Sequence, residues 1–173
     1  MPTGIESFTK KNKQMKFENV DKVFTLDEGS ENRPYKDSQE YWTIGKGHLI
    51  GANLENLYLS DHVINEIFKE DIEKTIKFAK DSVGEEFFEQ LCEPRKIAIL
   101  SMLFTLGPNK WEKFFETKEA IKACDWEEVS KRILQSKWAK DVDPKQRPDQ
   151  GRDDRIAYMF KYGKFHPDYK IKE

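Results

Sequence analysis

Residues 28–48 read EGSENRPYKDSQEYWTIGKGH, and this stretch decides the kind of fold to expect. It begins at Glu28, where a segment with helical spacing of apolar residues ends, and it continues with a strand-like pattern. Strand-like residues lie on both sides of a polar turn at 38–40, which predicts a tight β-hairpin that includes Asp37. Such a hairpin can bring two carboxyl groups, nine residues apart in the chain, toward one bond. Cleavage of a glycosidic bond uses two carboxyl groups in this way.

The candidate catalytic residues are Glu28, Asp37 and Thr43. Glu28 precedes Gly29, a typical helix-ending residue, and the negative end of a helix disfavours ionisation, which suits a proton donor. We expect Asp37, next to solvent on the hairpin, to orient or deprotonate a water molecule. The Thr43 hydroxyl is expected to return toward Asp37 and to help hold that water. His48 is expected to fix the hairpin by hydrogen bonding.

The apolar pattern elsewhere predicts a mostly helical chain. Helices are expected from Phe17 to Glu28, over about 60–80 with Ser60 as the cap, just after Gly84, over 97–106, from Thr117, from Asp125 and over about 152–162. The run at 97–106 is apolar on nearly every side, so we expect it to be a buried central helix. With one small hairpin added, the fold class is α+β.

Composition and charge exclude several functions. The 173 residues are 37% hydrophobic, and 30 basic against 32 acidic side chains give a net charge of −2. A balance of this kind predicts no nucleic-acid partner. No apolar run reaches the roughly 20 residues of a membrane helix, and the polar residues 1–17, read as a flexible arm, lack the apolar segment of a secretory signal. We do not expect the protein to insert into a membrane. We expect it to be synthesised in the host cytoplasm.

The two cysteines and three histidines indicate neither a metal nor a cofactor. Cys92 and Cys124 are 32 residues apart, which permits a disulfide without requiring one. We expect both to be reduced and buried, as small apolar residues. No His or Cys spacing is typical of a zinc site. The sequence therefore predicts chemistry carried by carboxyl groups.

The motif at 28–48 resembles the signature of the phage-type lysozymes, glycoside hydrolase family 24, which includes the lysozymes of T-even phages. That signature is a helix ending in Glu-Gly, then Tyr-x-Asp, a short turn, and an aromatic residue followed by Thr-Ile-Gly-x-Gly-His. The chain has Glu28-Gly29, Tyr35-Lys36-Asp37 and Trp42-Thr43-Ile44-Gly45-Lys46-Gly47-His48 at the same intervals. Weaker similarity covers about residues 18–165 and includes Ser136-Lys137-Trp138 and Arg152-Asp-Asp-Arg155.

The resemblance implies a two-lobed, lysozyme-like fold in one catalytic domain over 18–173. Its parts would be a small lobe at about 29–59, a linking helix at about 60–80 and a helical lobe at about 84–165. The implied activity is that of an inverting muramidase acting on bacterial peptidoglycan without a metal or cofactor. We expect a monomer that reaches the wall with the help of a membrane-permeabilising partner.

The resemblance also implies roles for residues outside the motif. An arginine at the place of Arg152 pairs with the catalytic acid in the family. Leu49, Phe104 and Thr117 match positions that contact the saccharide, although Phe104 fits a core position equally well. Arg132 stands where an asparagine contact is expected, which favours an anionic or peptide-bearing substrate.

Two further features depart from the family pattern. Glu40 occupies a turn position usually held by glycine, which predicts altered geometry or strain if the residue has a positive φ. The stretch between His48 and the linking helix is shorter than in the best-known member. This predicts one helix fewer in the small lobe and a cleft that is open at one end.

Two other functions stay open on the sequence alone. A lytic transglycosylase also needs a protonating Glu, but it forms an anhydro-sugar without water, so the presence of both Asp37 and Thr43 argues against it. A wall-binding or virion module without catalysis would fit the near-neutral charge and the altered turn. The intact set of Glu28, Asp37 and Thr43 argues against that module.

Overall fold

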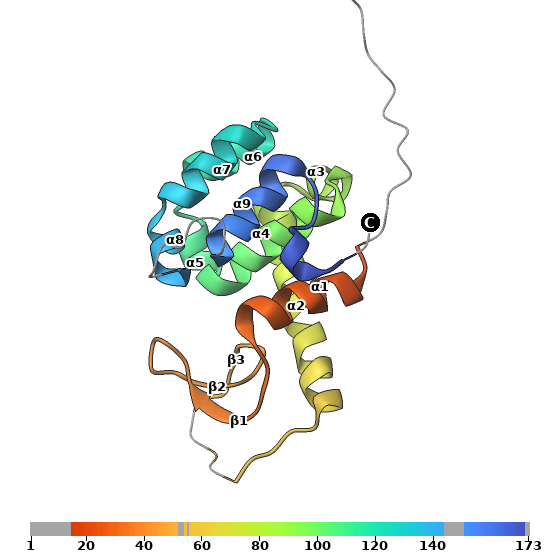
Figure 1. Cartoon of the computed structure of the whole chain (residues 1–173), viewed down its shortest axis with the longest axis vertical. Coiled ribbons are helices and arrows are strands. Elements are labelled where there is room, and N and C mark those ends of the chain that lie inside the picture. Colours follow the sequence, from red (N-terminus) through yellow and green to blue (C-terminus); the bar gives the residue numbers. More distant parts are fainter. Residues whose placement is uncertain (1–14, 52–53, 55, 144–150, 172–173) are drawn as a thin grey trace, which may run out of the picture.

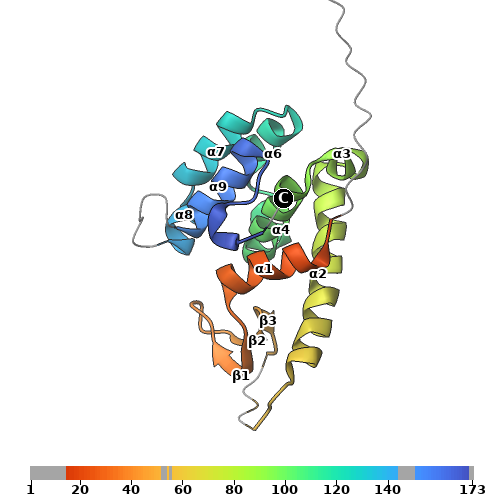
Figure 2. The ribbon, with the colours of Figure 1, turned by 45° about the vertical axis from the view of Figure 1, so that its right-hand side comes forward.

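The computed structural model describes residues 15–51, 54, 56–143 and 151–171. Its helices gather into one large group, a small antiparallel sheet lies beside them, and α2 (Asp61–Val83) extends from one part to the other (Figures 1 and 2). The fold is α+β and mostly helical, as the sequence predicts. The expected arm falls mainly on residues 1–14, outside the described part, whereas Met15 and Phe17 pack against the core.

Helix α1 (Phe17–Glu28) crosses the junction between the sheet and the helical group (Figure 2). Its side chains Val20, Val23 and Phe24 are almost fully buried. The helix ends at Gly29, whose φ of 73° is a conformation that glycine adopts without steric cost. Glu28 is therefore the last helical residue, at the point where the chain leaves the core for the sheet.

The sheet has three antiparallel strands in the order β1 (Glu31–Lys36), β2 (Trp42–Gly45) and β3 (His48–Leu49). The sequence predicts the first two, but β3 is too short to show a period of its own. Tyr35 pairs with Thr43, and Thr43 also pairs with Leu49. Side chains of directly paired residues share a face of a sheet, so these three residues lie on the same face.

The hairpin turn is closed by Asp37. Its Oδ1 accepts hydrogen bonds from the backbone N–H groups of Gln39 at 2.8 Å and Tyr41 at 3.0 Å. Glu40 has a φ of 65°, so the turn does place a non-glycine residue in the left-handed region. An exposed ion pair of 2.8 Å joins Glu40 to Lys36. The turn is therefore closed with a non-glycine residue in the left-handed conformation, at the position where the sequence predicts strain.

Helix α2 begins where the sequence predicts it. The Ser60 hydroxyl caps the helix by accepting from the N–H of Val63 at 3.5 Å. One side of α2 is buried, and it carries Ile64, Phe68, Ile72, Thr75, Ala79 and Val83. In the described residues between Leu49 and Ser60 the chain forms neither a helix nor a strand.

The helical group contains α3 (Glu85–Gln90), α4 (Glu93–Leu106), α5 (Pro108–Trp111), α6 (Phe115–Lys122), α7 (Trp126–Gln135), α8 (Lys137–Val142), α9 (Arg152–Tyr162) and the 3₁₀ helix η1 (Pro167–Tyr169). The sequence misses α5, α8 and η1, which are too short to show a helical period. Helix α6 begins at Phe115, two residues before the predicted Thr117. The predicted cap at Asp125 is confirmed, because its carboxylate accepts from the Glu128 N–H at 3.1 Å.

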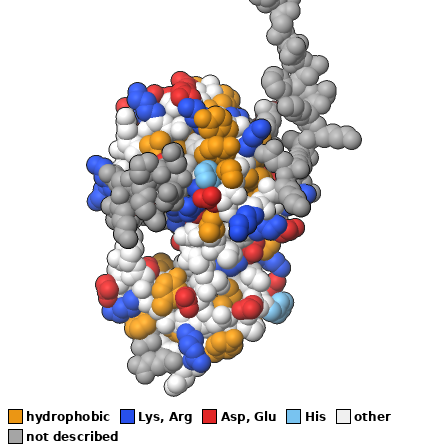
Figure 3. Space-filling model, in the orientation of Figure 1, with side chains coloured by type: hydrophobic (Ala, Val, Ile, Leu, Met, Phe, Trp, Pro, Cys, Tyr) orange, Lys and Arg blue, Asp and Glu red, His pale blue; other side chains and the backbone are white. Residues whose placement is uncertain are grey.

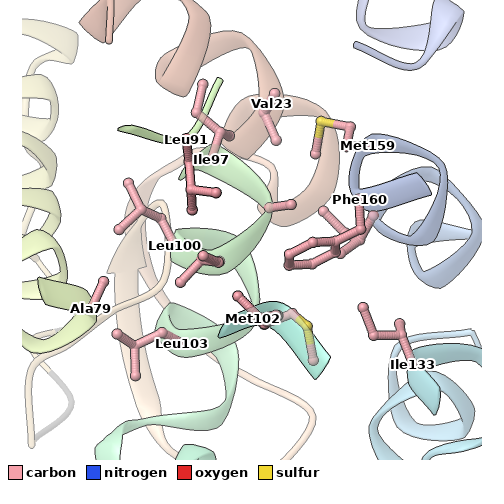
Figure 4. Packing of buried hydrophobic residues seen from close by; sticks show 14 of the residues in the cluster. Val23, Ala79, Leu91, Ile97, Leu100, Met102, Leu103, Ile133, Met159 and Phe160 are labelled. Carbon is pink, nitrogen blue, oxygen red and sulfur yellow. The ribbon is translucent and has the colours of Figure 1, made fainter. Parts of the chain in front are cut away.

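Helix α4 lies at the centre of the core. Its residues Ile97, Ala98, Ile99, Leu100 and Met102 are all 0% exposed. Figure 4 shows side chains from four other helices pointing toward it, Val23 of α1, Ala79 of α2, Ile133 of α7 and Met159 and Phe160 of α9. This confirms the predicted buried central helix. Because α1 and α9 both contact α4, the ends of these two helices are held close together.

The cysteines correct one expectation. Cys92 and Cys124 are free thiols, as predicted, but both are exposed. Burial was the wrong expectation because Cys92 precedes α4 and Cys124 follows α6, and such connections between helices lie at the surface. In the part of the chain that the structure describes, no helix is long and apolar enough to cross a membrane. Among the same residues, no group of three or more His, Cys, Asp and Glu side chains could hold a metal ion.

Candidate active site

Glu28 is paired with an arginine from the far end of the chain. Arg152 Nη2, on the first residue of α9, lies 2.7 Å from Glu28 Oε1. The side chains are 8% and 19% exposed, respectively, so the pair is largely shielded from water. The resemblance implies a pairing of Arg152 with Glu28, and the structure shows this contact. An opposite charge therefore lies directly beside the carboxylate at the end of α1.

Two hydroxyl groups of α4 contact the same nitrogen of Arg152. Thr105 Oγ1 lies 2.6 Å and Ser101 Oγ lies 3.1 Å from Nη2. Both side chains come from adjacent turns of one helix, and α4 is anchored by its buried apolar residues. The guanidinium is therefore fixed against the core as well as against Glu28.

The residue before Glu28 forms a second ion pair. Asp27 Oδ1 lies 2.7 Å from Arg155 Nη2, and its Oδ2 accepts a hydrogen bond of 3.0 Å from the Tyr169 hydroxyl. Asp27 Oδ2 also lies 3.7 Å from Arg152 Nε. The Asp27 side chain is 0% exposed, and burial beside this carboxylate raises the pKa of Tyr169 well above its ordinary value. Two successive carboxylates thus meet two arginines of α9.

Asp37 begins the hairpin turn, and Thr43 lies on β2 opposite Tyr35. Asp37 uses Oδ1 to close the turn, which leaves Oδ2 for other partners. Thr43 is 1% exposed, and its hydroxyl donates to the carbonyl oxygen of Tyr41 at 3.1 Å. That bond uses the hydroxyl's only proton, so its lone pairs are left to accept. The Thr43 oxygen is thus an acceptor in this state.

Tyr35 interacts electrostatically with both candidate carboxyls. Burial of the phenol, followed by the negative charges of Glu28 and Asp37, raises the pKa of Tyr35 above its ordinary value. The backbone N–H of Gly47 hydrogen-bonds to the same phenol oxygen. Tyr35 therefore stays neutral and keeps its phenolic proton. The sequence identifies Tyr35 as part of a motif but assigns it no role.

Residues 45–48 connect the sheet to the helices. His48 Nδ1 lies 2.7 Å from Asp71 Oδ2 of α2, so His48 binds the sheet to that helix. Lys46, only 6% exposed, pairs with Asp21 of α1. Gly47 has a φ of 86°, and a Cβ atom here would lie 3.2 Å from the Phe104 ring. Glycine permits this close approach of the sheet to α4.

The four predicted substrate contacts do not lie together. Leu49 is 60% exposed on the sheet. Phe104 packs on Phe24 with a centroid distance of 5.1 Å and borders the core, although it is only partly buried. Thr117 and Arg132 instead line a separate pocket of about 460 Å³ beside α6 and α7. Arg132 is paired there with Glu116 and Glu128.

Surface charge is mixed on the face seen in Figure 3, where basic and acidic side chains alternate without forming one basic patch. This agrees with the net charge of −2.

Sequence reasoning missed several residues around the acid. Ser101, Thr105, Asp27, Arg155 and Tyr169 all belong to the network that includes Glu28. The sequence offers two signals. One is the succession of two acids before a helix-ending glycine, and the other is the pair of arginines three residues apart at 152 and 155. Only the packing of α1 and α9 on α4 shows that these signals belong together.

The sequence model of the phage lysozyme family matches residues 26–152, most of the chain. The chain belongs to the phage lysozyme family. Two proteins of Dictyostelium discoideum are similar to this family member. "Probable T4-type lysozyme 1" is 27% identical over 139 residues, which cover 67% of this chain and 82% of that protein. "Probable T4-type lysozyme 2" is 26% identical over 165 residues, which cover 82% of this chain and 92% of that protein.

Membership of the phage lysozyme family implies a glycoside hydrolase whose substrate is peptidoglycan. The matched range includes Glu28 and the hairpin and ends at Arg152. It therefore covers both partners of the 2.7 Å ion pair.

Proposed function

We propose that this chain is an inverting muramidase that hydrolyses the β-1,4 bond between N-acetylmuramic acid and N-acetylglucosamine in bacterial peptidoglycan. The observation that carries the proposal is the setting of Glu28. This carboxyl ends α1, is 19% exposed and is held by Arg152, while Tyr35 interacts with both Glu28 and Asp37. Two carboxyls thus interact electrostatically with one phenol on β1 of the sheet.

In the proposed reaction, protonated Glu28 donates its proton to the glycosidic oxygen as the bond from that oxygen to the anomeric carbon breaks. A water molecule attacks the anomeric carbon from the opposite face of the sugar. Asp37 takes a proton from this water, and the Thr43 oxygen helps to orient it. Inverting enzymes keep their carboxyl groups roughly 6.5–9.5 Å apart so that a water fits between them.

The resting ion pair gives Arg152 a defined part in this proposal. While Glu28 is ionised, Arg152 Nη2 holds Oε1 at 2.7 Å and fixes the side chain. When Glu28 carries the proton for the leaving group, the Asp27 carboxylate remains as a counter-ion for Arg152. Asp27 Oδ2 lies 3.7 Å from Arg152 Nε. A buried arginine is thus not left without a counter-ion.

The test is digestion of purified walls by the wild type, Glu28→Gln and Asp37→Asn, with the products identified by mass. Wild-type activity should produce reducing muramic ends that have gained one water. Glu28→Gln should lose activity by about 10²–10⁴-fold, because the amide cannot donate the proton. Full activity of Glu28→Gln would overturn the assignment of the acid.

The other possible functions are outcomes of the same assay. Products that lack the added water and end in an anhydro-sugar would identify a lytic transglycosylase. Wall binding without cleavage by the wild type would identify a non-catalytic module. A monomeric state and release through a membrane-permeabilising partner are further parts of the proposal, and sedimentation measurements test the former.

A further inference from the structure

A single nitrogen atom of Arg152 serves several oxygen atoms. Nη2 lies 2.7 Å from Glu28 Oε1, 2.6 Å from Thr105 Oγ1, 3.1 Å from Ser101 Oγ and 3.4 Å from the Ser101 carbonyl oxygen. An Nη2 group carries only two protons. The three side-chain oxygens therefore compete for these two protons. When one acceptor is lost, Arg152 depends more strongly on the acceptors that remain.

The direction of the Thr105 proton is decided by distance. Thr105 Oγ1 lies 2.8 Å from the Ser101 carbonyl oxygen and 3.5 Å from Glu28 Oε1. The shorter contact is the better hydrogen bond, so the hydroxyl donates to Ser101 and turns its lone pairs toward Arg152. Thr105 is thus chiefly an acceptor for the guanidinium and only weakly a donor to Glu28.

The need for this acceptor changes with the charge of Glu28. An ionised Glu28 is a strong partner for Arg152, whereas a protonated Glu28 is a weak one. Arg152 is only 8% exposed, so water replaces a lost partner poorly. An acceptor that does not depend on Glu28 lowers the free energy of the protonated state relative to the ionised one.

We propose that Thr105, assisted by Ser101, is a positioning residue that holds Arg152 while Glu28 is protonated. The hydroxyl keeps the guanidinium in place and thereby makes the proton-carrying form of Glu28 more accessible. Thr105 does not need to touch the substrate for this purpose. The role in catalysis rests on the proposed function, whereas the effect on Glu28 protonation does not.

Other charged and titratable groups surround this centre. Asp27 on α1 and Arg155 on α9 form the neighbouring ion pair, Tyr169 of η1 donates to Asp27, and Tyr35 of β1 interacts with Glu28. These groups are unchanged in a variant at position 105. A shift in the titration of Glu28 between such variants therefore reports the hydroxyl itself.

The first experiment measures protonation without substrate. The titration of the Glu28 side-chain carboxyl is followed by ¹³C NMR in the wild type, Thr105→Val and Thr105→Ser. We expect Thr105→Val to move the titration to lower pH by about 0.5–1 unit, the size of one lost hydrogen bond. Thr105→Ser keeps the hydroxyl and should titrate like the wild type. An unshifted titration in Thr105→Val, or a shift to higher pH, would overturn the proposal.

A matched control removes a similar hydroxyl elsewhere. Thr75 on α2 donates to the Asp71 carbonyl oxygen at 2.7 Å, four residues earlier, as Thr105 donates to Ser101. Thr75→Val should leave the Glu28 titration unchanged. A shift as large as that of Thr105→Val would assign the effect to altered helix packing and would also overturn the proposal.

The second experiment measures wall hydrolysis against pH. Activity that needs protonated Glu28 falls on the alkaline side, and this limb should move to lower pH in Thr105→Val. On that limb we expect kcat/KM to be about three- to tenfold below the wild type, with Thr105→Ser restoring it. A wild type without hydrolysis would overturn the proposed function and leave the NMR test valid. An active wild type with identical limbs in both variants would overturn the role of Thr105 alone.

Discussion

Lys46 and Asp21 form an ion pair that fastens the turn after β2 to α1. The Lys46 side chain is 5% exposed, and its ammonium nitrogen lies 5.0 Å from the centroid of the Phe68 ring on α2. One buried lysine thus connects the sheet with both helices that border it. A residue at the variable position of the Gly-x-Gly segment has become a structural link.

Replacing Asp21 by Asn should destabilise the protein by about 2 kcal/mol. Removal of one partner leaves a buried charge uncompensated, which costs about 3–5 kcal/mol in a fully buried pair. We expect less here because the Asp21 side chain is 35% exposed and water can partly replace it. Urea unfolding at neutral pH measures the difference in the free energy of unfolding.

The matched control for Asp21→Asn is Glu18→Gln on the same helix. Glu18 pairs with Lys22 at 2.7 Å, but their side chains are 73% and 44% exposed. Such a surface pair contributes little, so the control should remain within about 0.5 kcal/mol of the wild type. Equal effects of the two substitutions would show that burial of Lys46 does not matter.

Tyr169 gives the protein a stability that depends on pH. Burial and Asp27 raise the pKa of Tyr169 from its ordinary value of 10.0 in the folded state. The folded state therefore binds this proton more tightly, and its stabilising effect is present below pH 10 and is lost as the pH rises further. Tyr169→Phe should lower stability at pH 7 by about 1–2 kcal/mol, because Asp27 Oδ2 loses its 3.0 Å donor.

Chemical unfolding between pH 7 and pH 11 tests the Tyr169 prediction. The decline of wild-type stability above about pH 10 should be shallower in Tyr169→Phe. Tyr162→Phe is the control, since Tyr162 is 55% exposed. If Tyr162→Phe flattened the decline as much as Tyr169→Phe, Tyr169 would not be its source.

Tyr35→Phe should reduce wall hydrolysis by about tenfold while it changes stability by less than about 1 kcal/mol. The substitution keeps the ring but removes the hydroxyl that bonds the Gly47 N–H and interacts with Glu28 and Asp37. Initial rates on purified walls at several pH values measure the effect. Tyr41→Phe, at an exposed position of the hairpin, should retain activity. Wild-type rates in Tyr35→Phe would exclude a role for its hydroxyl.

Local patterns predicted the long elements of the fold. The ends of α1 at Gly29 and of α9 at Gly163, and the cap of α2 at Ser60, follow from residue types that act on their immediate neighbours. The helices α5 and α8 and the two-residue β3 are stabilised mainly by packing, which a period within one segment does not reveal. Exposure of Cys92 and Cys124 likewise depends on which connections reach the surface.

The site was predictable where it lies within one segment. Glu28, Asp37 and Thr43 belong to a single motif, and the resemblance also identified Arg152. The partners of Arg152 on α4 and the pairing of Asp27 with Arg155 depend on how three helices meet. No residue spacing in the sequence indicates that these three helices pack together, because the paired residues lie up to 128 residues apart.

Glu40→Gly should stabilise the protein by roughly 0.5–1 kcal/mol. Glu40 has a φ of 65°, and the left-handed conformation costs a residue with a Cβ atom about 1–2 kcal/mol. Glycine avoids this cost, although its greater freedom in the unfolded chain cancels part of the gain. The lost ion pair with Lys36 contributes little, because the Glu40 side chain is 77% exposed. Thermal and urea unfolding measure the change.

Two further substitutions at this turn separate backbone strain from the ion pair. Glu40→Ala removes the charge but keeps the Cβ atom, so it should be no more stable than the wild type. Glu40→Asn should lie between Ala and Gly, because Asn tolerates the left-handed region better than most residues. If Ala stabilised the protein as much as Gly, the charge of Glu40 and not its backbone would be the source of strain. Stability that decreases in the order Gly, Asn, Ala would instead show that the backbone at position 40 is strained. Glycine would then relieve the strain of the turn that Asp37 closes.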